Sequence, residues 1–284
     1  MQNENTSEFR QLEITPTLAA IERLQHDRGY RDSRGLFFTE GVRNFIAAVD
    51  HRFPVDTLLY SEKLLIQPLA RKLVRRLKRA GVPFARVTPE QFRRVSRTER
   101  ASGVAAILRQ RILRLDQINL TDNPCWTALS HVRSPGNLGT LMRTSAATGA
   151  AGFILLGNAI DPFDPAVIRA TMGSLFKQTI VRTTVDQLRR CACLNKITVI
   201  GASPDGSEDY REVTYTRPVV LMLGGERKGL TDEQRGLCNR IVRIPMVEGM
   251  DSLNMAVAGS LLMYDVFRFG APIPNGLGES GRQT

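Results

Sequence analysis

Apolar and polar positions follow two different periods in the first part of the chain. Apolar residues recur every three or four positions after Pro16, after Gly41 and over residues 69–80, which predicts a helix in each place. Short continuous apolar runs lie between these segments and predict strands at residues 36–41, 57–60 and 104–108. The capping-box sequence Thr88-Pro89-Glu90-Gln91 predicts the start of one more helix. Helices that alternate with strands in this way indicate a small α/β domain, which we place at residues 15–111.

A second and more regular alternation begins after residue 124. Its short apolar runs predict strands at residues 126–131, 152–156, 179–183, 197–202, 218–223 and 241–244. Helical periodicity is found between and after them, at residues 138–148, 165–172, 184–194, 231–239 and 252–268. This order predicts a parallel sheet covered by helices on both faces, in a second α/β domain at residues 125–269.

The remaining segments are predicted to lie outside the two domains. Residues 112–124 read as a linker that ends in the turn chemistry of Asp122-Asn123-Pro124. The polar residues 1–14 are expected to form a disordered tail, and the Gly- and Pro-rich residues 270–284 a flexible one.

The composition limits where the protein works. No apolar run approaches the roughly 20 residues that span a membrane, and the first residues lack the apolar core of a signal peptide. The four cysteines do not have the spacing of a zinc site, so reduced thiols are expected. We therefore expect a cytoplasmic protein with no membrane partner and no metal.

The charge of the chain is strongly uneven. The formal net charge is +11 and the pI is about 10.1. Residues 1–116 hold 22 Lys and Arg against 13 Asp and Glu, whereas residues 117–284 hold 17 against 15. A basic surface of this kind favours a polyanionic partner, with nucleic acid ahead of a membrane.

The helix predicted at residues 69–80 carries much of this charge. Leu69, Leu73, Val74 and Leu77 are expected to face inward, while six cations and no anion occupy the other positions. A solvated charged face is the alternative interpretation, but like charges at these spacings repel each other. We therefore expect contact with an RNA backbone, made by Arg71, Arg75 and Arg79 and by the basic connection that holds Arg31 and Arg34.

Three segments of the second domain depart from the regular alternation. The first joins a strand to a helix and contains Asn137, Gly139 and Arg143. In the second, the strand 218–223 runs directly into Gly224-Gly225-Glu226, where bare backbone leaves room for a ligand. The third runs from Ile244-Pro245 to Ser252-Leu253-Asn254, with Ser252 as the expected N-cap of the last helix.

Taken together, the order and spacing of these segments resemble the three motifs of the SpoU/TrmH family in the SPOUT superfamily. The family's N-x-G-x-x-x-R element matches residues 137–143, its strand–G-x-E element matches 224–230, and its IP…SLN element matches 244–254. The first domain is similar, less specifically, to the L30e-like RNA-binding domain that precedes the catalytic domain in many members, among them 23S rRNA ribose methyltransferases.

The resemblance implies a fold and a cofactor. It implies a parallel sheet with a deep trefoil knot, although chains are generally unknotted, and S-adenosyl-L-methionine (AdoMet) bound in that knot. Residues at the matching positions, Gly224, Ile244 and Leu253, are then expected to line the cofactor pocket. It further implies a homodimer that methylates a ribose 2′-hydroxyl of RNA, and we expect 23S rRNA as the substrate.

The matching residues also suggest how the hydroxyl is activated. Family resemblance implicates Arg143, but a guanidinium with a pKa above about 12 is a poor base. A clamp that holds phosphate and orients the hydroxyl suits its charge better. Asn137, Glu226, Ser252 and Asn254 are expected to complete the hydrogen-bond network.

Two alternatives remain open from the sequence. One is a tRNA ribose methyltransferase of the same family, although the additional first domain favours rRNA. The other is an RNA-binding protein that keeps the fold without catalysis. Titration with AdoMet separates the second alternative from an enzyme.

Overall fold

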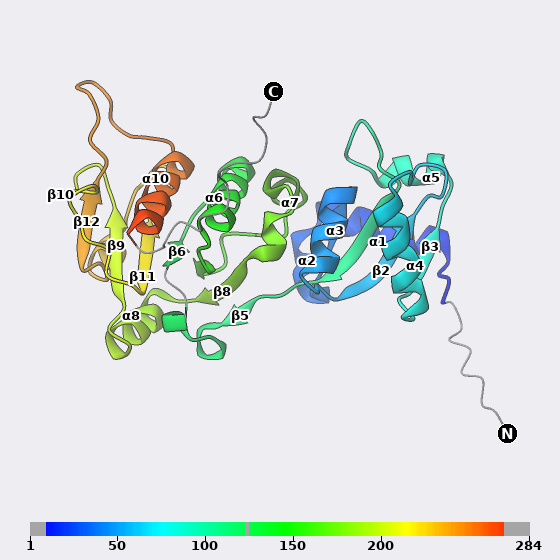
Figure 1. Cartoon of the computed structure of the whole chain (residues 1–284), viewed down its shortest axis with the longest axis horizontal. Helices are drawn as coiled ribbons and strands as arrows, with labels where there is room; N and C mark the ends of the chain where they lie inside the picture. The colour runs from blue at the N-terminus through cyan, green and yellow to red at the C-terminus, as the bar shows by residue number, and fades with distance from the viewer. Residues whose placement is uncertain (1–9, 123–124, 270–284) are drawn as a thin grey trace, which may run out of the picture. The chain divides into compact units, whose positions relative to one another are not determined.

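The computed structural model describes residues 10–122 and 125–269 (Figure 1). Contacts between Cα atoms divide the chain into two compact units. The first unit holds the chain up to residue 112 with residues 133–143 and 160–179; the second holds residues 113–132, 144–159 and the chain from residue 180. Two segments of the predicted second domain therefore group with the first unit. Residues 1–9 and 270–284 of the predicted tails lie outside the described residues. The predicted disorder is wrong for residues 10–14, because Leu12 N donates a hydrogen bond to Phe84 O at 2.7 Å and a helix begins at Ile14.

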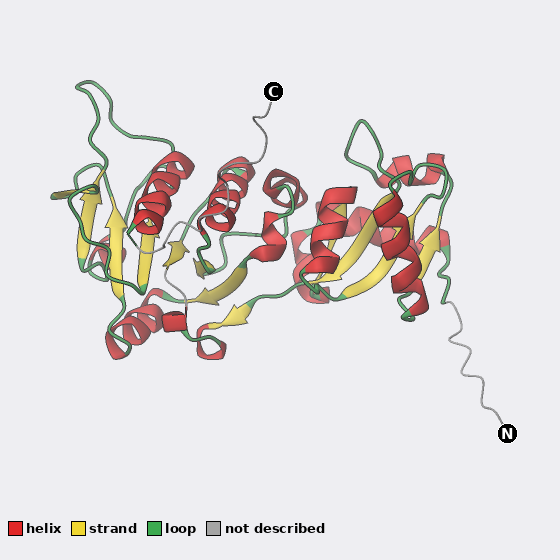
Figure 2. Cartoon of the chain, viewed as in Figure 1, coloured by secondary structure: helices red, strands yellow, loops and turns green. Residues whose placement is uncertain are grey.

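The first unit is built on a mixed sheet of four strands in the order β1-β4-β2-β3 (Figure 2). Strand β4 runs antiparallel to β1 and β2, whereas β3 runs parallel to β2. Their bounds are Leu36–Glu40 for β1, Val55–Tyr60 for β2, Phe84–Arg86 for β3 and Val104–Arg109 for β4. The sequence predicted every strand except the short β3, which Gln11 extends through an isolated bridge to Phe84.

Five helices accompany this sheet, with the bounds Ile14–His26 (α1), Arg28–Arg34 (α2), Val42–Asp50 (α3), Pro68–Arg79 (α4) and Pro89–Val95 (α5). Helix α1 buries Leu18, Ile21 and Leu24, the three residues whose spacing predicted it. Helix α5 begins at a complete capping box, because Gln91 N donates a hydrogen bond to Thr88 Oγ1 and Thr88 N donates one to Gln91 Oε1. Both helices were predicted from local sequence, and both are confirmed.

In helix α4, the predicted burial of Leu69 is wrong. Its buried residues are Ala70, Leu73 and Val74, whereas Leu69 is 53% exposed. Ala70 lies at the centre of the buried stripe that Leu73 and Val74 define, whereas Leu69 lies at the edge of this stripe, in the first turn of the helix.

A parallel sheet of eight strands forms the second unit, in the order β10-β12-β9-β11-β6-β7-β8-β5. Every pairing whose register is described is parallel. Six strands match the predicted ones: Cys125–Leu129 (β6), Gly152–Leu156 (β7), Thr179–Thr183 (β8), Thr198–Ala202 (β9), Val219–Leu223 (β11) and Arg240–Arg243 (β12). The two short edge strands, Leu113–Arg114 (β5) and Glu208–Asp209 (β10), were not predicted from the sequence.

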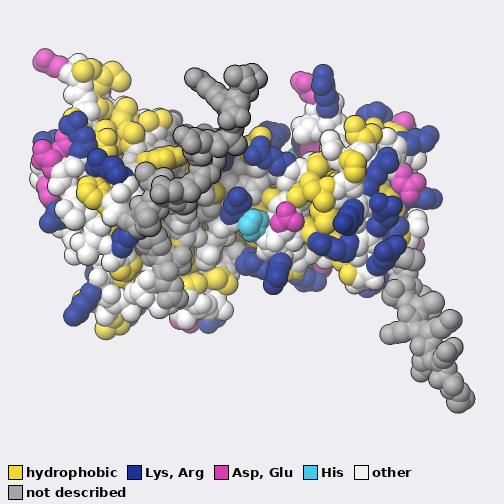
Figure 3. All heavy atoms as spheres, in the orientation of Figure 1, with side chains coloured by type: hydrophobic (Ala, Val, Ile, Leu, Met, Phe, Trp, Pro, Cys, Tyr) yellow, Lys and Arg dark blue, Asp and Glu magenta, His cyan; other side chains and the backbone are white. Residues whose placement is uncertain are grey.

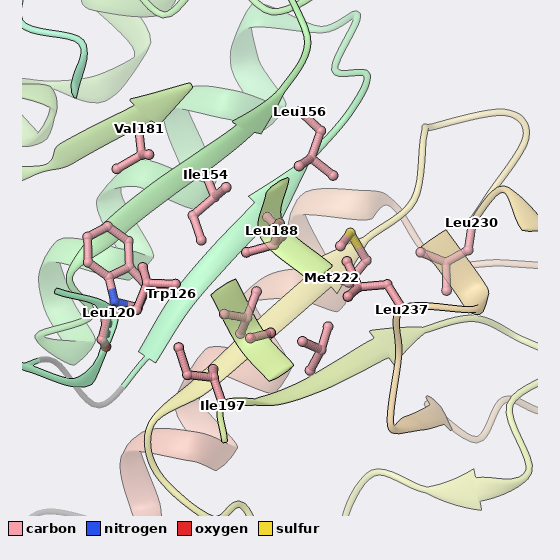
Figure 4. Close-up of a cluster of buried hydrophobic side chains, with 14 residues drawn as sticks. Leu120, Trp126, Ile154, Leu156, Val181, Leu188, Ile197, Met222, Leu230 and Leu237 are labelled. Carbon is pink, nitrogen blue, oxygen red and sulfur yellow. Dashed lines mark hydrogen bonds between the residues drawn. The ribbon is translucent and has the colours of Figure 1, made fainter. Parts of the chain in front are cut away.

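The segment predicted as a linker contributes to this sheet and its core. Residues 113–114 pair with β8, and two single 3₁₀ turns, Leu115–Gln117 and Leu120–Asp122, follow. Trp126 of β6 donates a hydrogen bond from Nε1 to the carbonyl oxygen of Leu120 at 3.2 Å. Figure 4 shows this indole in a cluster of buried apolar side chains that includes Ile154 and Val181 of the sheet and Leu188 of helix α8 (Val185–Leu194).

Helices complete the second unit on both faces of the sheet, as predicted. Helix α10 (Met255–Arg268) lies on one side of the strands in Figure 1, and α8 (Val185–Leu194) lies on the other. Helix α6 (Pro135–Thr148) links to α10 through a hydrogen bond of 2.8 Å between Thr144 Oγ1 and Ser260 Oγ. No helix among the described residues has both the length and the apolar character needed to cross a membrane.

Candidate functional site

A cavity of about 430 Å³ opens in the second unit. Its walls include residues at the carboxyl ends of three neighbouring strands: Ala202 of β9, Leu223 of β11 and Val242 of β12. Parallel sheets bind ligands at the carboxyl ends of their strands, because there the loops diverge and backbone groups are free. The cavity therefore lies where this architecture places a ligand.

One wall is a turn of bare backbone that follows β11. Gly225 and Gly229 exchange two backbone hydrogen bonds of 2.9 Å each, which closes residues 225–229 into a tight loop. A methyl group added to Gly224 would lie 2.1 Å from the carbonyl carbon of Gly229, so any larger residue would force the turn open. Close packing of backbone on backbone thus explains the glycine requirement at position 224.

Other parts of the cavity wall are apolar or charged. Leu223, Ile244, Met246, Leu253 and Met255 supply the apolar surface. Glu226, Arg227 and Lys228 project from the glycine turn, and Asp205 and Arg235 stand on the side of β9. An apolar slot with exposed backbone and several charged groups at its rim suits an amphipathic ligand that has a flat ring and polar substituents.

Asp205 and Arg235 form a fixed ion pair within this wall. Arg235 Nη2 donates to both carboxylate oxygens of Asp205 at 2.9 Å. Ser203 Oγ also donates to Asp205 Oδ1. The hydrogen bond from Arg235, followed by that from Ser203, lowers the pKa of Asp205 below its ordinary value, so the carboxylate is charged at neutral pH.

The structure brings together five of the residues predicted from the three motifs. Gly224, Glu226, Ile244, Ser252 and Leu253 all line this one cavity, and all five come from the second and third motifs. The functional roles assigned to them remain predictions. Asp205 and Arg235 were missed, because the polar turn after β9 carries no motif of its own.

Asn254 caps the last helix, a role that the sequence predicted for Ser252. Its side chain accepts hydrogen bonds from Ala256 N at 2.8 Å and Val257 N at 3.3 Å, so Asn254 is the N-cap of α10. The described side chain of Asn254 does not line the cavity, whereas Ser252 does. The expected N-cap at Ser252 is therefore wrong by two residues, because the helix begins only at Met255.

The first motif lies on helix α6. Asn137 and Gly139 are in its first turns, and Arg143 is exposed further along. A methyl group on Gly139 would lie 2.4 Å from Ala170 Cβ, so this glycine lets α6 approach α7 (Pro165–Thr171) closely. Residues 133–143 belong to the first unit, whereas the cavity belongs to the second.

The residues predicted to bind RNA divide into two groups. Arg34, Arg71, Arg75 and Arg79 are exposed, and Lys and Arg side chains gather over the part of the first unit that contains α4 (Figure 3). Arg31, in contrast, is only 3% exposed and lies 2.6 Å from Asp161. A guanidinium that is buried and paired cannot reach a phosphate, so the predicted RNA contact of Arg31 is not supported by the structure.

Comparison with known proteins identifies the family. Residues 125–264 match the SpoU rRNA Methylase family, and residues 16–106 match the MRM3-like substrate binding domain. The chain is 32% identical to a 23S rRNA (uridine(2479)-2′-O)-methyltransferase of Streptomyces viridochromogenes, over 90% of this chain and 91% of that relative. The chain belongs to the SpoU rRNA methylase family.

Solved structures of SpoU-type and rRNA methyltransferases share the fold of this family member. An AdoMet-bound rRNA methyltransferase from Sinorhizobium meliloti superposes with a TM-score of 0.81 at 31% identity, covering 91% of this chain and 97% of that one. The SpoU methyltransferase AviRb from Streptomyces viridochromogenes, in complex with AdoMet, gives a TM-score of 0.79 at 29% identity, covering 89% and 97%. Both alignments include the two domains predicted from the sequence.

Proposed function

We propose that this protein transfers the methyl group of AdoMet to a ribose 2′-hydroxyl of RNA, with 23S rRNA as its substrate. The observation that carries the proposal is the single cavity in which Gly224, Glu226, Ile244, Ser252 and Leu253 meet. The match of residues 16–106 to a substrate-binding domain favours a large rRNA over tRNA. The AdoMet bound to the relative from Sinorhizobium meliloti supports the same cofactor here.

The cavity fits the chemistry of AdoMet. Apolar side chains such as Ile244 and Leu253 can enclose a purine ring, and the bare backbone at Gly224 can approach it closely. The carboxylates of Glu226 and Asp205 offer hydrogen-bond acceptors to the polar groups of the cofactor. When bound, AdoMet supplies an electrophilic methyl group on a sulfonium, which reacts without a metal.

The task of the protein is then to hold and orient the ribose hydroxyl. Arg143 is exposed on α6, directly before Thr144, whose hydroxyl is hydrogen-bonded to Ser260 of α10. We assign to Arg143 the clamping of a substrate phosphate, because a guanidinium stays charged and offers a fork of donors. Asn137, Glu226 and Ser252 are proposed to hydrogen-bond the substrate or cofactor, and Asn254 to support them by fixing the start of α10.

Replacement of Arg143 tests this assignment. We expect Arg143→Ala to lower the rate of methyl transfer by about 10²–10³-fold, as when a donor to the transition state is removed, with the Kd for AdoMet unchanged. Arg143→Lys should rescue little, since lysine lacks the fork. Transfer of labelled methyl groups to total RNA, followed by mapping of the modified ribose, measures both the rate and the substrate. Near-normal turnover of Arg143→Ala would reject the role.

A homodimer is part of the same proposal. Helix α10 exposes Val257, Leu261 and Tyr264, at 48%, 39% and 53%, and these residues follow the spacing of one helix face. Apolar side chains gathered in this way mark contact surfaces. We propose that a second copy of the chain covers this face.

The trefoil knot and the L30e-like character of the first domain are likewise proposed. Helix α10 follows β12, a strand near the edge of the sheet, but packs on β11, which lies two positions further into the sheet. The chain thus turns back toward the middle of the sheet after β12, which supports the proposed knot. Stretching a single molecule from both ends tests for the knot. A knotted chain reaches a final length shorter than its full contour, whereas an unknotted chain extends fully.

A further inference from the structure

The loop after β9 presents an acceptor group that no motif accounts for. Asp205 is held from one side by Arg235, which bonds both carboxylate oxygens, and by Ser203, which bonds Oδ1. Arg235 also donates to Ser203 Oγ at 3.0 Å, so the three side chains form a closed network. All three residues line the cavity.

This network leaves Asp205 free to accept further hydrogen bonds. A carboxylate offers about four lone-pair positions, and the three bonds from Arg235 and Ser203 occupy most but not all of them. The side chain of Asp205 is 66% exposed. An ion pair with this exposure contributes little to stability, whereas an acceptor fixed in place by its neighbours is well suited to a ligand.

The charge balance selects the kind of donor. Arg235 neutralises the carboxylate at a distance of 2.9 Å, so a second cation bound there would be repelled by the guanidinium. Neutral hydroxyl groups carry no such penalty. The network therefore favours a sugar hydroxyl over an ammonium group.

The position of Asp205 in the sheet points to the same ligand group. Strand β9 lies beside β11, with Ala202 in register with Leu223, so Asp205 stands next to the glycine turn. In Rossmann-type parallel sheets an acidic residue about 20 residues after the glycine turn holds the ribose of the dinucleotide. Asp205 comes before the glycine turn in sequence, but it lines the same cavity and offers the same type of acceptor.

We propose that Asp205 accepts hydrogen bonds from the ribose cis-diol of the nucleoside cofactor, with Arg235 and Ser203 as positioning residues. The inference rests on the proposed function, because it assumes a nucleoside in this cavity. It adds a residue that determines cofactor affinity, outside the three motifs.

Calorimetric binding of S-adenosylhomocysteine to the full-length protein tests the proposal. We expect Asp205→Asn to weaken binding about tenfold, the loss of one or two hydrogen bonds. The 2′-deoxy and 3′-deoxy analogues should bind the unaltered protein more weakly by a similar factor, and Asp205→Asn should weaken their binding little further. Arg235→Gln should reduce the difference in affinity between the unmodified ligand and its deoxy analogues, because Asp205 is then no longer held in place. The matched control is Asp186→Asn, an acidic residue paired with Arg189 outside the cavity, which should change no affinity.

Other outcomes would overturn the proposal. If Asp205→Asn weakens the binding of the deoxy analogues but not that of an analogue without the amino group, the carboxylate binds the ammonium group and not the ribose. If Asp205→Asn lowers the affinity for every analogue by the same factor, Asp205 recognises no particular group of the ligand and forms only a surface ion pair with Arg235. If Asp205→Asn does not fold, a crystal structure with the nucleoside decides, since the ribose hydroxyls must lie within hydrogen-bond distance of Asp205. Absence of binding by the unaltered protein would instead reject the proposed function, and this inference with it.

Discussion

Among single residues, Arg31 differs most clearly from its prediction, because its charged side chain is buried and does not face RNA. Its guanidinium donates to Leu24 O at 2.8 Å and to Asp161 Oδ2 at 2.6 Å, with Asp164 at 3.9 Å. The side chains of Arg31 and Asp161 are only 4% and 11% exposed. This arginine thus joins α2 to the segment before α7 within the first unit, and it is structural.

Removal of the partner carboxylate should be costly. We expect Asp161→Asn to lower the free energy of unfolding by about 3 kcal/mol, because the charge of Arg31 stays buried with only the more distant carboxylate of Asp164, at 3.9 Å, to compensate it. Urea denaturation measures the change. Asp186→Asn, which breaks the exposed pair with Arg189, is the control and should cost less than about 1 kcal/mol. Equal effects of the two variants would contradict the structural role of Arg31.

Asp209 gives a prediction about pH. Hydrogen bonds from the Arg211 side chain, and then from its backbone, lower the pKa of Asp209 from 3.8 to about 2. A lowered pKa means that the charged form is stabilised in the folded protein, so this stability is complete above pH 3.8 and is lost as the pH falls through about 2. Denaturation at a series of acidic pH values should show this loss, and Asp209→Asn and Arg211→Ala should both reduce it. An unchanged pH profile in both variants would refute the assignment.

At the scale of elements, helix α4 concentrates exposed cations on a surface of the first unit. Lys78 is the exception, since its Nζ donates to the Tyr60 hydroxyl at 3.0 Å and lies 4.2 Å from the centre of the Phe84 ring. Arg71 folds back toward Leu65 O but remains exposed. The other cations of α4 are exposed, which agrees with the proposed contact to an RNA backbone.

Salt dependence of RNA binding tests α4. Replacing Arg71, Arg75 and Arg79 together by alanine should weaken RNA binding and reduce the slope of log K against log salt by about 2, at roughly 0.7 for each phosphate contact to a single strand. The control replaces Arg189, Arg190 and Lys196, cations in and just after α8 of the second unit. Equal slopes for the α4 variant and the unaltered protein would exclude α4 from the RNA-binding surface.

Local sequence predicted most elements but not all their ends. The capping box at Thr88 and the apolar spacing of α1 are short-range signals, so both were found correctly. Helix α2 was taken for a connection, because its seven residues, RGYRDSR, contain no apolar stripe. Its start is fixed by Asp27, which caps Tyr30 N, and by the burial of Arg31, which depends on a carboxylate 130 residues away.

On the scale of the whole molecule, the exposed apolar face of α10 bears on assembly. We expect Leu261→Glu to convert a dimer into a monomer, because a charge in an apolar contact surface loses its hydration without a partner. Light scattering after size-exclusion chromatography measures the mass. Leu194→Glu is the matched control, since Leu194 is 83% exposed at the end of α8. A monomeric unaltered protein, or a dimer that survives Leu261→Glu, would contradict the proposed interface.

Local patterns along the chain were enough to predict the alternation of helices and strands, the parallel second sheet and the three motifs. These features depend on hydrophobic period, turn chemistry and short-range spacing, all of which are visible in neighbouring residues. The fold was needed to show that Gly224, Ile244 and Leu253 share one cavity with Asp205 and Arg235, and that residues 133–143 and 160–179 group with the first unit. It also decided that Arg31 is buried rather than exposed. Burial and ion pairing depend on which distant segments pack together, and no local pattern carries that information.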